Sequence, residues 1–175
     1  MKRMTGIGAS EGVSIGKVLL FITEEIVIPE IKEEGSTIEA ELAKLKEGLK
    51  KSKTQLIAIR EKVKEKMGED KAAIFDGHIM LLEDEDLIME VEGKIKEEGF
   101  PAAKALHDGI NEYCDMISQL DDPYLRERAA DLKDIGKRWL KNLLGMKIHD
   151  LSNLAPGTIV VTEDLTPSDT AQLDL

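Results

Sequence analysis

Histidines are the first candidates for chemistry in this sequence, because an imidazole near neutral pH can carry a proton, a covalent intermediate or a metal ion. The three histidines, His78, His107 and His149, lie on different segments without the close spacing of a metal-binding pair. His78 sits in the apolar run 74–82, where a histidine is more often hydrogen-bonded structurally than catalytic. The sequence therefore predicts no metal site, and His78 is interpreted as structural.

Acidic side chains form a second group, because residues 69–92 contain nine acidic residues and one basic residue, Lys71. The run Asp84–Asp86 lacks the spacing and the central glycine of a calcium loop, and its charges favour the start of a helix. Next to Met80, Leu81 and Leu87, these carboxylates can form an apolar patch with a negative rim. Such a patch suits a basic protein partner.

The remaining candidates are less specific. The turn 166–170 offers backbone N–H groups and hydroxyls that could support a phosphate, although the same residues make an ordinary helix start. Gly6 and Gly8 do not form a dinucleotide loop, since Glu11 occupies the place of the third glycine and no strand precedes them. Cys114 is interpreted as a small buried hydrophobe.

The elements that must position these residues begin with an extended region. Apolar residues over 13–21 and 26–28 predict two strands. A capping box of Ser36 and Glu39 then predicts a helix start. Apolar residues three and four apart continue this helix for about 30 residues, to Met67–Gly68.

Four more helical segments are expected, and the residues after them again have the pattern of a strand followed by a helix. They cover residues 69–82, a stretch from Asp84 or Glu85 to about Ile95, a stretch from Pro101 to about Leu120, and a stretch from Asp122–Pro123 to Gly145. A strand follows at 158–161, and Thr166 caps a last helix that continues to Leu175. The predicted fold is α+β, a helical hairpin bundle inserted into an incomplete α/β domain. Its parts are residues 1–32, 33–145 and 146–175.

Composition narrows the kinds of partner. The 175 residues include 35 acidic and 24 basic ones, for a net charge of -11, which argues against nucleic acid. No stretch has the length of a membrane span, and the N-terminus lacks a signal-peptide apolar run. Cys114 is the single cysteine, so no intrachain disulfide can form, and a cytoplasmic location is expected.

Four motifs, in order along the whole chain, together resemble Enzyme I of the bacterial phosphotransferase system, the phosphoenolpyruvate-protein phosphotransferase. They are GIGASEG at 6–12, IFDGHIMLLED at 74–84, ERAADLKDIGKR at 127–138 and DLTPS at 164–168. The resemblance implies that the helical insertion binds the small phosphocarrier protein HPr and that the surrounding α/β domain carries a phosphohistidine. It also implies a separate C-terminal barrel that binds phosphoenolpyruvate and magnesium and forms a homodimer.

The resemblance places the acceptor histidine in a Gly-Gly-x-Thr-Ser-His motif beyond Leu175, so this chain alone is expected to be inactive and without cofactors. Thr170 matches the family threonine that contacts the active imidazole, and Lys71 matches a nearby lysine. Both are supporting residues, and their ordinary interpretation is as exposed helix residues. By the same resemblance, the HPr-binding face comprises Glu69, Asp70, Asp76, Met80, Leu81, Asp84, Glu85, Leu87, Leu125 and Arg128.

Two alternatives remain open. The chain could be a helical interaction module without chemistry, or part of a related phosphoenolpyruvate-using dikinase that shares the swivelling histidine domain. The Gly-His-Ile-Met-Leu run at 77–81 favours Enzyme I.

Overall fold

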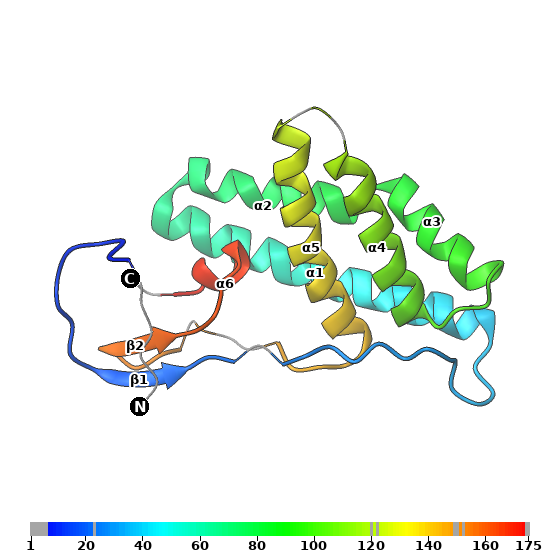
Figure 1. Ribbon diagram of the computed structural model, residues 1–175, viewed down its shortest axis with the longest axis horizontal. Coiled ribbons are helices and arrows are strands. Elements are labelled where there is room, and N and C mark those ends of the chain that lie inside the picture. Colours follow the sequence, from blue (N-terminus) through cyan, green and yellow to red (C-terminus); the bar gives the residue numbers. More distant parts are fainter. Residues whose placement is uncertain are drawn as a thin grey trace.

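The computed structural model describes residues 7–22, 24–119, 121, 123–148, 151 and 153–173, with side chains excepted at 123–125 and 127. Five long helices lie between two short strands, and a single-turn helix follows (Figure 1). The elements are β1 Lys17–Leu20, α1 Ile38–Met67, α2 Glu69–Leu82, α3 Glu85–Lys96, α4 Ala102–Ser118, α5 Pro123–Leu143, β2 Thr158–Val161 and α6 Pro167–Thr170. The predicted fold class is confirmed, while the residue bounds of the three parts remain a prediction.

Helices α1 and α2 form an antiparallel hairpin that turns at Gly68. The predicted apolar stripe of α1 faces the core, with Leu45, Leu56 and Val63 almost fully buried. Ser52, which interrupts the stripe, is also buried, because its hydroxyl donates to the Gly48 carbonyl and accepts from the Asn142 amide at 2.8 Å in each case. The spacing of apolar residues in the sequence therefore predicted correctly which side of α1 packs against the other helices.

The start of α1 differs from the predicted capping box. Thr37, one residue later than expected, is the N-cap, and its hydroxyl accepts from the Ala40 N–H at 3.2 Å. Ser36 instead donates to the carboxylate of Glu41. The capping prediction was wrong because Thr37, and not Ser36, is the residue whose hydroxyl accepts from a free N–H of the first turn.

Glu41 is a buried charge that ties the first helix to the fourth. It is 2% exposed, and its carboxylate accepts from the Ala102 N–H at 2.8 Å and from Lys44 at 3.0 Å. Burial disfavours the carboxylate, but hydrogen bonds from Ala102, Ser36 and Lys44 outweigh it, and the pKa of Glu41 is lowered. Glu41 thus caps the N-terminus of α4 from a distant part of the sequence.

Replacing Glu41 with glutamine is expected to lower the free energy of unfolding at pH 7 by about 1–3 kcal/mol, since charge-assisted hydrogen bonds are lost. Because the pKa is lowered in the folded state, this stabilisation exists above the unfolded pKa and is lost as pH falls through the folded value. Urea unfolding of both proteins at pH 7 and pH 3 checks the sign. A stability difference that does not shrink in acid would contradict this role.

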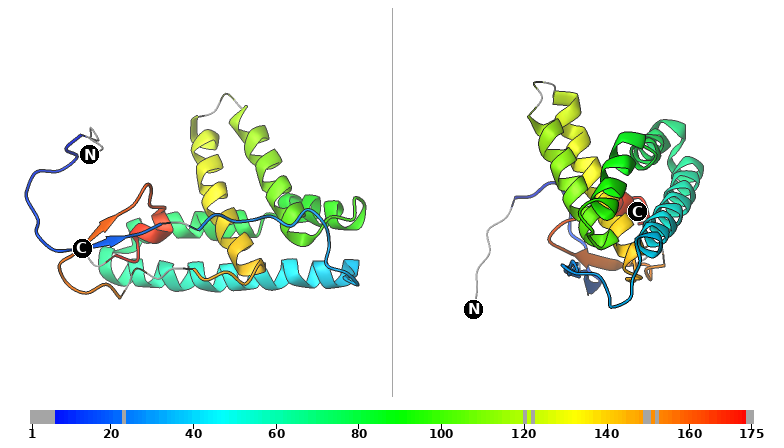
Figure 2. Two further views of the ribbon diagram at one scale, coloured as in Figure 1. Left: turned by 60° about the horizontal axis from the view of Figure 1, so that its bottom comes forward. Right: turned by 90° about the vertical axis from the view of Figure 1, so that its right-hand side faces the viewer.

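The N-terminal region contains one strand rather than two. Strand β1 pairs in parallel with β2, with Lys17 opposite Thr158, so a segment near the start of the chain and a segment near its end lie side by side next to the helices (Figure 2). Residues 26–28 are extended but pair with no strand among the described residues, because Ile26 and Ile28 pack against the helical core instead. The second predicted strand was therefore wrong.

Helices α3, α4 and α5 complete the bundle. Asp84 is the N-cap of α3, as predicted, whereas Pro101 is the N-cap of α4 rather than its first residue. Thr166 caps α6 through a capping box with Asp169, but α6 ends at Thr170, well before the predicted end. Within the described part of the chain, no helix combines the length and apolarity needed to cross a membrane.

Candidate docking surface on α2 and α3

The exposed side of α2 brings together three of the residues predicted to bind a partner. Glu69, Asp76 and Met80 recur at helical spacing and are all exposed, opposite a buried side that contains Ala72 and Phe75. The Met80 side chain is 71% exposed. An exposed apolar side chain with carboxylates one helical turn away on either side, Asp76 and Asp84, has the composition of a docking contact, an apolar centre with a charged rim.

The start of α3 extends this surface. The Asp84 carboxylate accepts from the Leu87 N–H at 3.0 Å, and the neighbouring Glu85 is exposed. Leu87 itself is only 1% exposed and packs in the core, so its assignment to the partner-binding face was wrong. Its position inside the N-terminal turn of α3 directs it toward the bundle. We call the set Glu69, Asp70, Asp76, Met80, Leu81, Asp84, Glu85 and Arg128 the acidic face.

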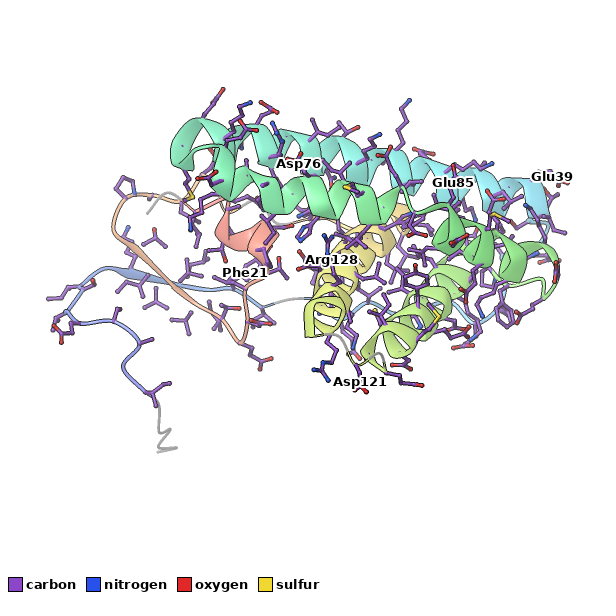
Figure 3. The ribbon with its side chains drawn as sticks, turned by 90° about the horizontal axis from the view of Figure 1, so that it is seen from above. Phe21, Glu39, Asp76, Glu85, Asp121 and Arg128 are labelled. Carbon is purple, nitrogen blue, oxygen red and sulfur yellow. The ribbon has the colours of Figure 1, made fainter. Side chains whose placement is uncertain are left out.

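Arg128 reaches the acidic face from α5, as Figure 3 shows. A Cβ atom at Gly77 would lie 3.1 Å from Arg128 Nη1, so a glycine leaves room for the guanidinium against α2. A glycine inside a helix lowers its stability by about 1 kcal/mol relative to alanine. The close approach of Arg128 explains why a glycine nevertheless occupies this position. Leu125, also predicted to contact the partner, lies outside the residues whose side chains are described.

Two of the predicted acidic residues are paired within the chain. Arg60 of α1 contacts Glu69 at 2.6 Å and Asp76 at 2.9 Å. Lys64 contacts the second oxygen of Glu69 at 2.7 Å, and its hydrogen bond is the main cause that lowers the pKa of Glu69. Among the described residues, Asp70, Asp84 and Glu85 have no such ion pair and carry the unbalanced negative charge of the face.

His78 lies behind the acidic face, on the buried side of α2. It is 0% exposed, and the nearest carboxylate oxygen is that of Asp131, 3.4 Å from Nε2. The Phe75 ring packs edge-on with a centroid separation of 5.5 Å. The ring is therefore enclosed by the helices and closed to a phosphoryl donor. Neither ring nitrogen has a hydrogen-bond partner among the described residues, so the expected structural hydrogen bond is not found. His107 is partly exposed and contacts Asp108 and Asn111 on its own helix.

A polar seam on α5, formed by half-buried Asp134 and buried Arg138, joins this helix to α6 and to α1. Ser168 of α6 donates to the Asp134 carboxylate at 3.2 Å. Arg138, 8% exposed, donates to Gln55 of α1 at 3.0 Å. Burial raises the pKa of Asp134, although the charges of Arg138 and His78 oppose this. The seam thus ties α5 to α6 and to α1 through charged side chains.

Acid is expected to affect Asp134 in the sense opposite to Glu41. A pKa raised by folding means that the group contributes stability below its unfolded pKa and loses it as pH rises through the folded value. Replacing Asp134 with asparagine removes this titration. We expect the stability of the wild type relative to Asp134→Asn to increase between pH 7 and pH 4. Urea unfolding at both pH values checks this, and a constant difference would contradict it.

Thr170 and Lys71, the predicted supporting residues, are both exposed. The Thr170 hydroxyl donates to the Thr166 carbonyl at 3.0 Å, within the single turn of α6. No hydrogen bond joins these two side chains in the described structure, so it does not bring them together as one site. Their roles remain predictions.

A small cavity of about 80 Å³ lies beside Thr166, but its charges do not mark an anion site. Three cationic side chains of α5 face three carboxylates there. The lining residues are Phe21, Asp134, Lys137, Arg138, Lys141, Ile148, Asp164, Thr166 and Asp169. Across the described residues, no group of three potential metal ligands is close enough to hold an ion.

Arg60 was not identified from the sequence as an ion-pair partner of Asp76, although the position of the turn between α1 and α2 indicates this pair. In an antiparallel hairpin of two helices, residues equally distant from the turn lie side by side, since both helices rise 1.5 Å per residue. Arg60 and Asp76 are each eight residues from Gly68, and Lys53 and Glu83, which also form an ion pair, are each fifteen residues from it. The turn at Gly68 therefore predicts both pairs.

Comparison with known proteins agrees with this architecture. Residues 5–128 match the family described as PEP-utilising enzyme, N-terminal. The chain is 41% identical over 173 residues to a phosphoenolpyruvate-protein phosphotransferase of Staphylococcus carnosus and 43% identical over 172 residues to one of Haemophilus influenzae. These alignments include 99% and 98% of this chain but only 30% of each relative.

Two solved structures are also similar. A solution structure of Enzyme I has a TM-score of 0.84 and 41% identity, covering 94% of this chain and 66% of that one. The N-terminal domain of a protein described as Enzyme 1 - Nitrogen has a TM-score of 0.67 over 90% of this chain and 64% of that one. At 24% identity, the second likeness shows the fold alone.

Proposed function

The chain belongs to the family of N-terminal regions of phosphoenolpyruvate-utilising enzymes, and from this premise we propose that it is the carrier-docking part of a phosphoenolpyruvate-protein phosphotransferase. In this proposal the acidic face binds the phosphocarrier protein HPr. The longer protein transfers a phosphoryl group from phosphoenolpyruvate through its own histidine to HPr, in sugar uptake. In this proposal the protein acts in the bacterial cytoplasm.

The exposed Met80 between carboxylates is the observation that supports docking most directly. Apolar contacts with Met80 and Leu81 supply the binding free energy, while Asp70 and Glu85 raise the rate of encounter with a basic partner. Arg128 borders the apolar centre from α5 and can donate to carbonyl or carboxylate groups of the partner.

The parts needed for chemistry are assigned elsewhere in the longer protein. Since the chain spans about 30% of its curated relatives, we propose that phosphoenolpyruvate, magnesium and the homodimer contact belong to regions outside these 175 residues. Thr170 is proposed to orient the acceptor imidazole, and Lys71 to favour an incoming phosphate. His78, fully buried, is not the acceptor.

Titration of the isotope-labelled chain with HPr, followed by NMR and calorimetry, tests docking. We expect saturable shifts confined to α2, α3 and the start of α5, and an affinity that falls with added salt. Shifts that map to β1 and β2 alone, or the absence of binding at low salt, would refute the proposal. A pure interaction module for another partner would then be the better explanation.

Incubation with labelled phosphoenolpyruvate gives a separate test of the chemistry. This chain alone is expected to remain unlabelled, whereas the full-length protein becomes labelled at one histidine. Label on His78, His107 or His149 of the isolated chain would overturn the assignment. Full-length protein that phosphorylates pyruvate from ATP, rather than HPr, would favour the dikinase alternative.

A further inference from the structure

Arg60 is a half-buried partner of the acidic face that no predicted site includes. Its side chain is 18% exposed and comes from α1, beside the α2 stripe. Nε donates to Asp76 Oδ1 at 2.9 Å and Nη2 donates to Asp76 Oδ2 at 3.3 Å. This two-point contact fixes the plane of the Asp76 carboxylate, because the guanidinium itself is planar and rigid.

The same guanidinium also holds Glu69. Nη2 donates to Glu69 Oε1 at 2.6 Å, while Lys64 occupies Glu69 Oε2 at 2.7 Å. Glu69 and Asp76 are seven residues apart on one side of α2, two helical turns, and Met80 continues the row. Arg60 therefore bridges two carboxylates of α2 along the edge of the row, while its Nη1 donates to a third, Glu61 of α1, at 2.9 Å. Arg128 at Gly77 borders the row from the other side.

We propose that Arg60 is a positioning and specificity-determining residue of the acidic face, which holds Glu69 and Asp76 in place for a cationic partner and lowers their effective charge. This inference rests on the proposed docking function. The oxygens of Asp76 have a fixed orientation and already accept hydrogen bonds from Arg60. A partner cation must therefore approach them in a direction that Arg60 leaves open, and a cation placed elsewhere adds little binding free energy.

The two effects of Arg60 act on different rate constants. Its positive charge weakens long-range attraction, which governs the association rate and its dependence on salt. Its hydrogen bonds spare the partner the cost of ordering two flexible carboxylates, which slows dissociation. Removing Arg60 is therefore expected to accelerate both association and dissociation.

Stopped-flow binding to HPr at several ionic strengths separates these effects. For Arg60→Met we expect association at low salt about 3-fold faster with a steeper salt dependence, and dissociation about 10-fold faster. Arg60→Lys keeps the charge, so its salt dependence matches the wild type, but dissociation is faster because the two-point contact is lost. Lys51→Met is the matched control. It removes one charge nine residues away, on the opposite side of α1.

A double-mutant cycle of Arg60→Met with Asp76→Asn guards against a merely structural effect. If Arg60 acts through Asp76, the dissociation rates of the two single variants and the double variant are non-additive. Circular dichroism and urea unfolding establish that each variant is folded. Equal rates for Arg60→Met and Lys51→Met, or additivity in the cycle, would overturn the role of Arg60. A wild-type chain that does not bind HPr would instead refute the docking function itself.

Discussion

Met80→Lys is expected to weaken HPr binding by at least about 30-fold, because the few hot-spot side chains at the centre of an interface each contribute ~2 kcal/mol or more. The substitution removes an apolar contact and places a cation where a basic partner docks. Stability should change by no more than about 0.5 kcal/mol, since Met80 is 71% exposed. A cation in the last turn of α2 also suits the helix dipole. Calorimetric titration of folded protein measures the effect.

Val27→Lys is the matched control for Met80→Lys. Val27 is 80% exposed on the extended N-terminal segment, so the same type of change is made away from the acidic face. We expect wild-type affinity for this variant. If both variants bind equally, whether strongly or weakly, Met80 does not lie at the centre of the docking surface.

Trp139→Ala is expected to have the largest effect on stability, a loss of about 3–5 kcal/mol in the free energy of unfolding. Trp139 is 0% exposed, and its indole Nε1–H donates to the Leu45 carbonyl at 3.0 Å. Gly48 permits this packing, since a Cβ there would lie 3.1 Å from Trp139 Cδ1. Alanine leaves a cavity between α1 and α5 that the flanking helices fill only in part.

Trp139→Phe separates volume from hydrogen bonding. Phenylalanine retains much of the apolar volume and loses the bond to Leu45, so a smaller loss of about 1–2 kcal/mol is expected. Because Trp139 is the single tryptophan, unfolding of these variants must be followed by far-UV circular dichroism rather than by fluorescence. A loss below about 1 kcal/mol for Trp139→Ala would contradict this role in the core.

Local signals in the sequence were sufficient for the helices and for much of the candidate surface. The apolar period of α1, the break at Gly68 and the acidic start of α3 are properties of neighbouring residues, and the structure confirms all three. The exposure of Glu69, Asp76 and Met80 follows from the same period, because residues opposite an apolar stripe face solvent.

Errors occurred where a distant residue competed with a local signal. Ser36 donates to the carboxylate of Glu41, which is itself held by the start of α4, while Thr37 caps α1. Residues 26–28 have the composition of a strand but pack on the helices. Leu87 was assigned to the surface from its neighbours in sequence, whereas the crossing of α3 over the bundle buries it.

The sequence by itself thus determined where the five long helices lie and which side of α1 is polar, because apolar periodicity and helix breaks depend on residues within a few positions. Only the tertiary structure decided which charges are free and which are paired. Arg138 with Gln55, Asp134 with Ser168 and Glu41 with Ala102 are pairs that form once helices from separate parts of the chain pack together. An ion pair or hydrogen bond requires contact at about 3 Å, and no local pattern specifies that distance for residues far apart in sequence.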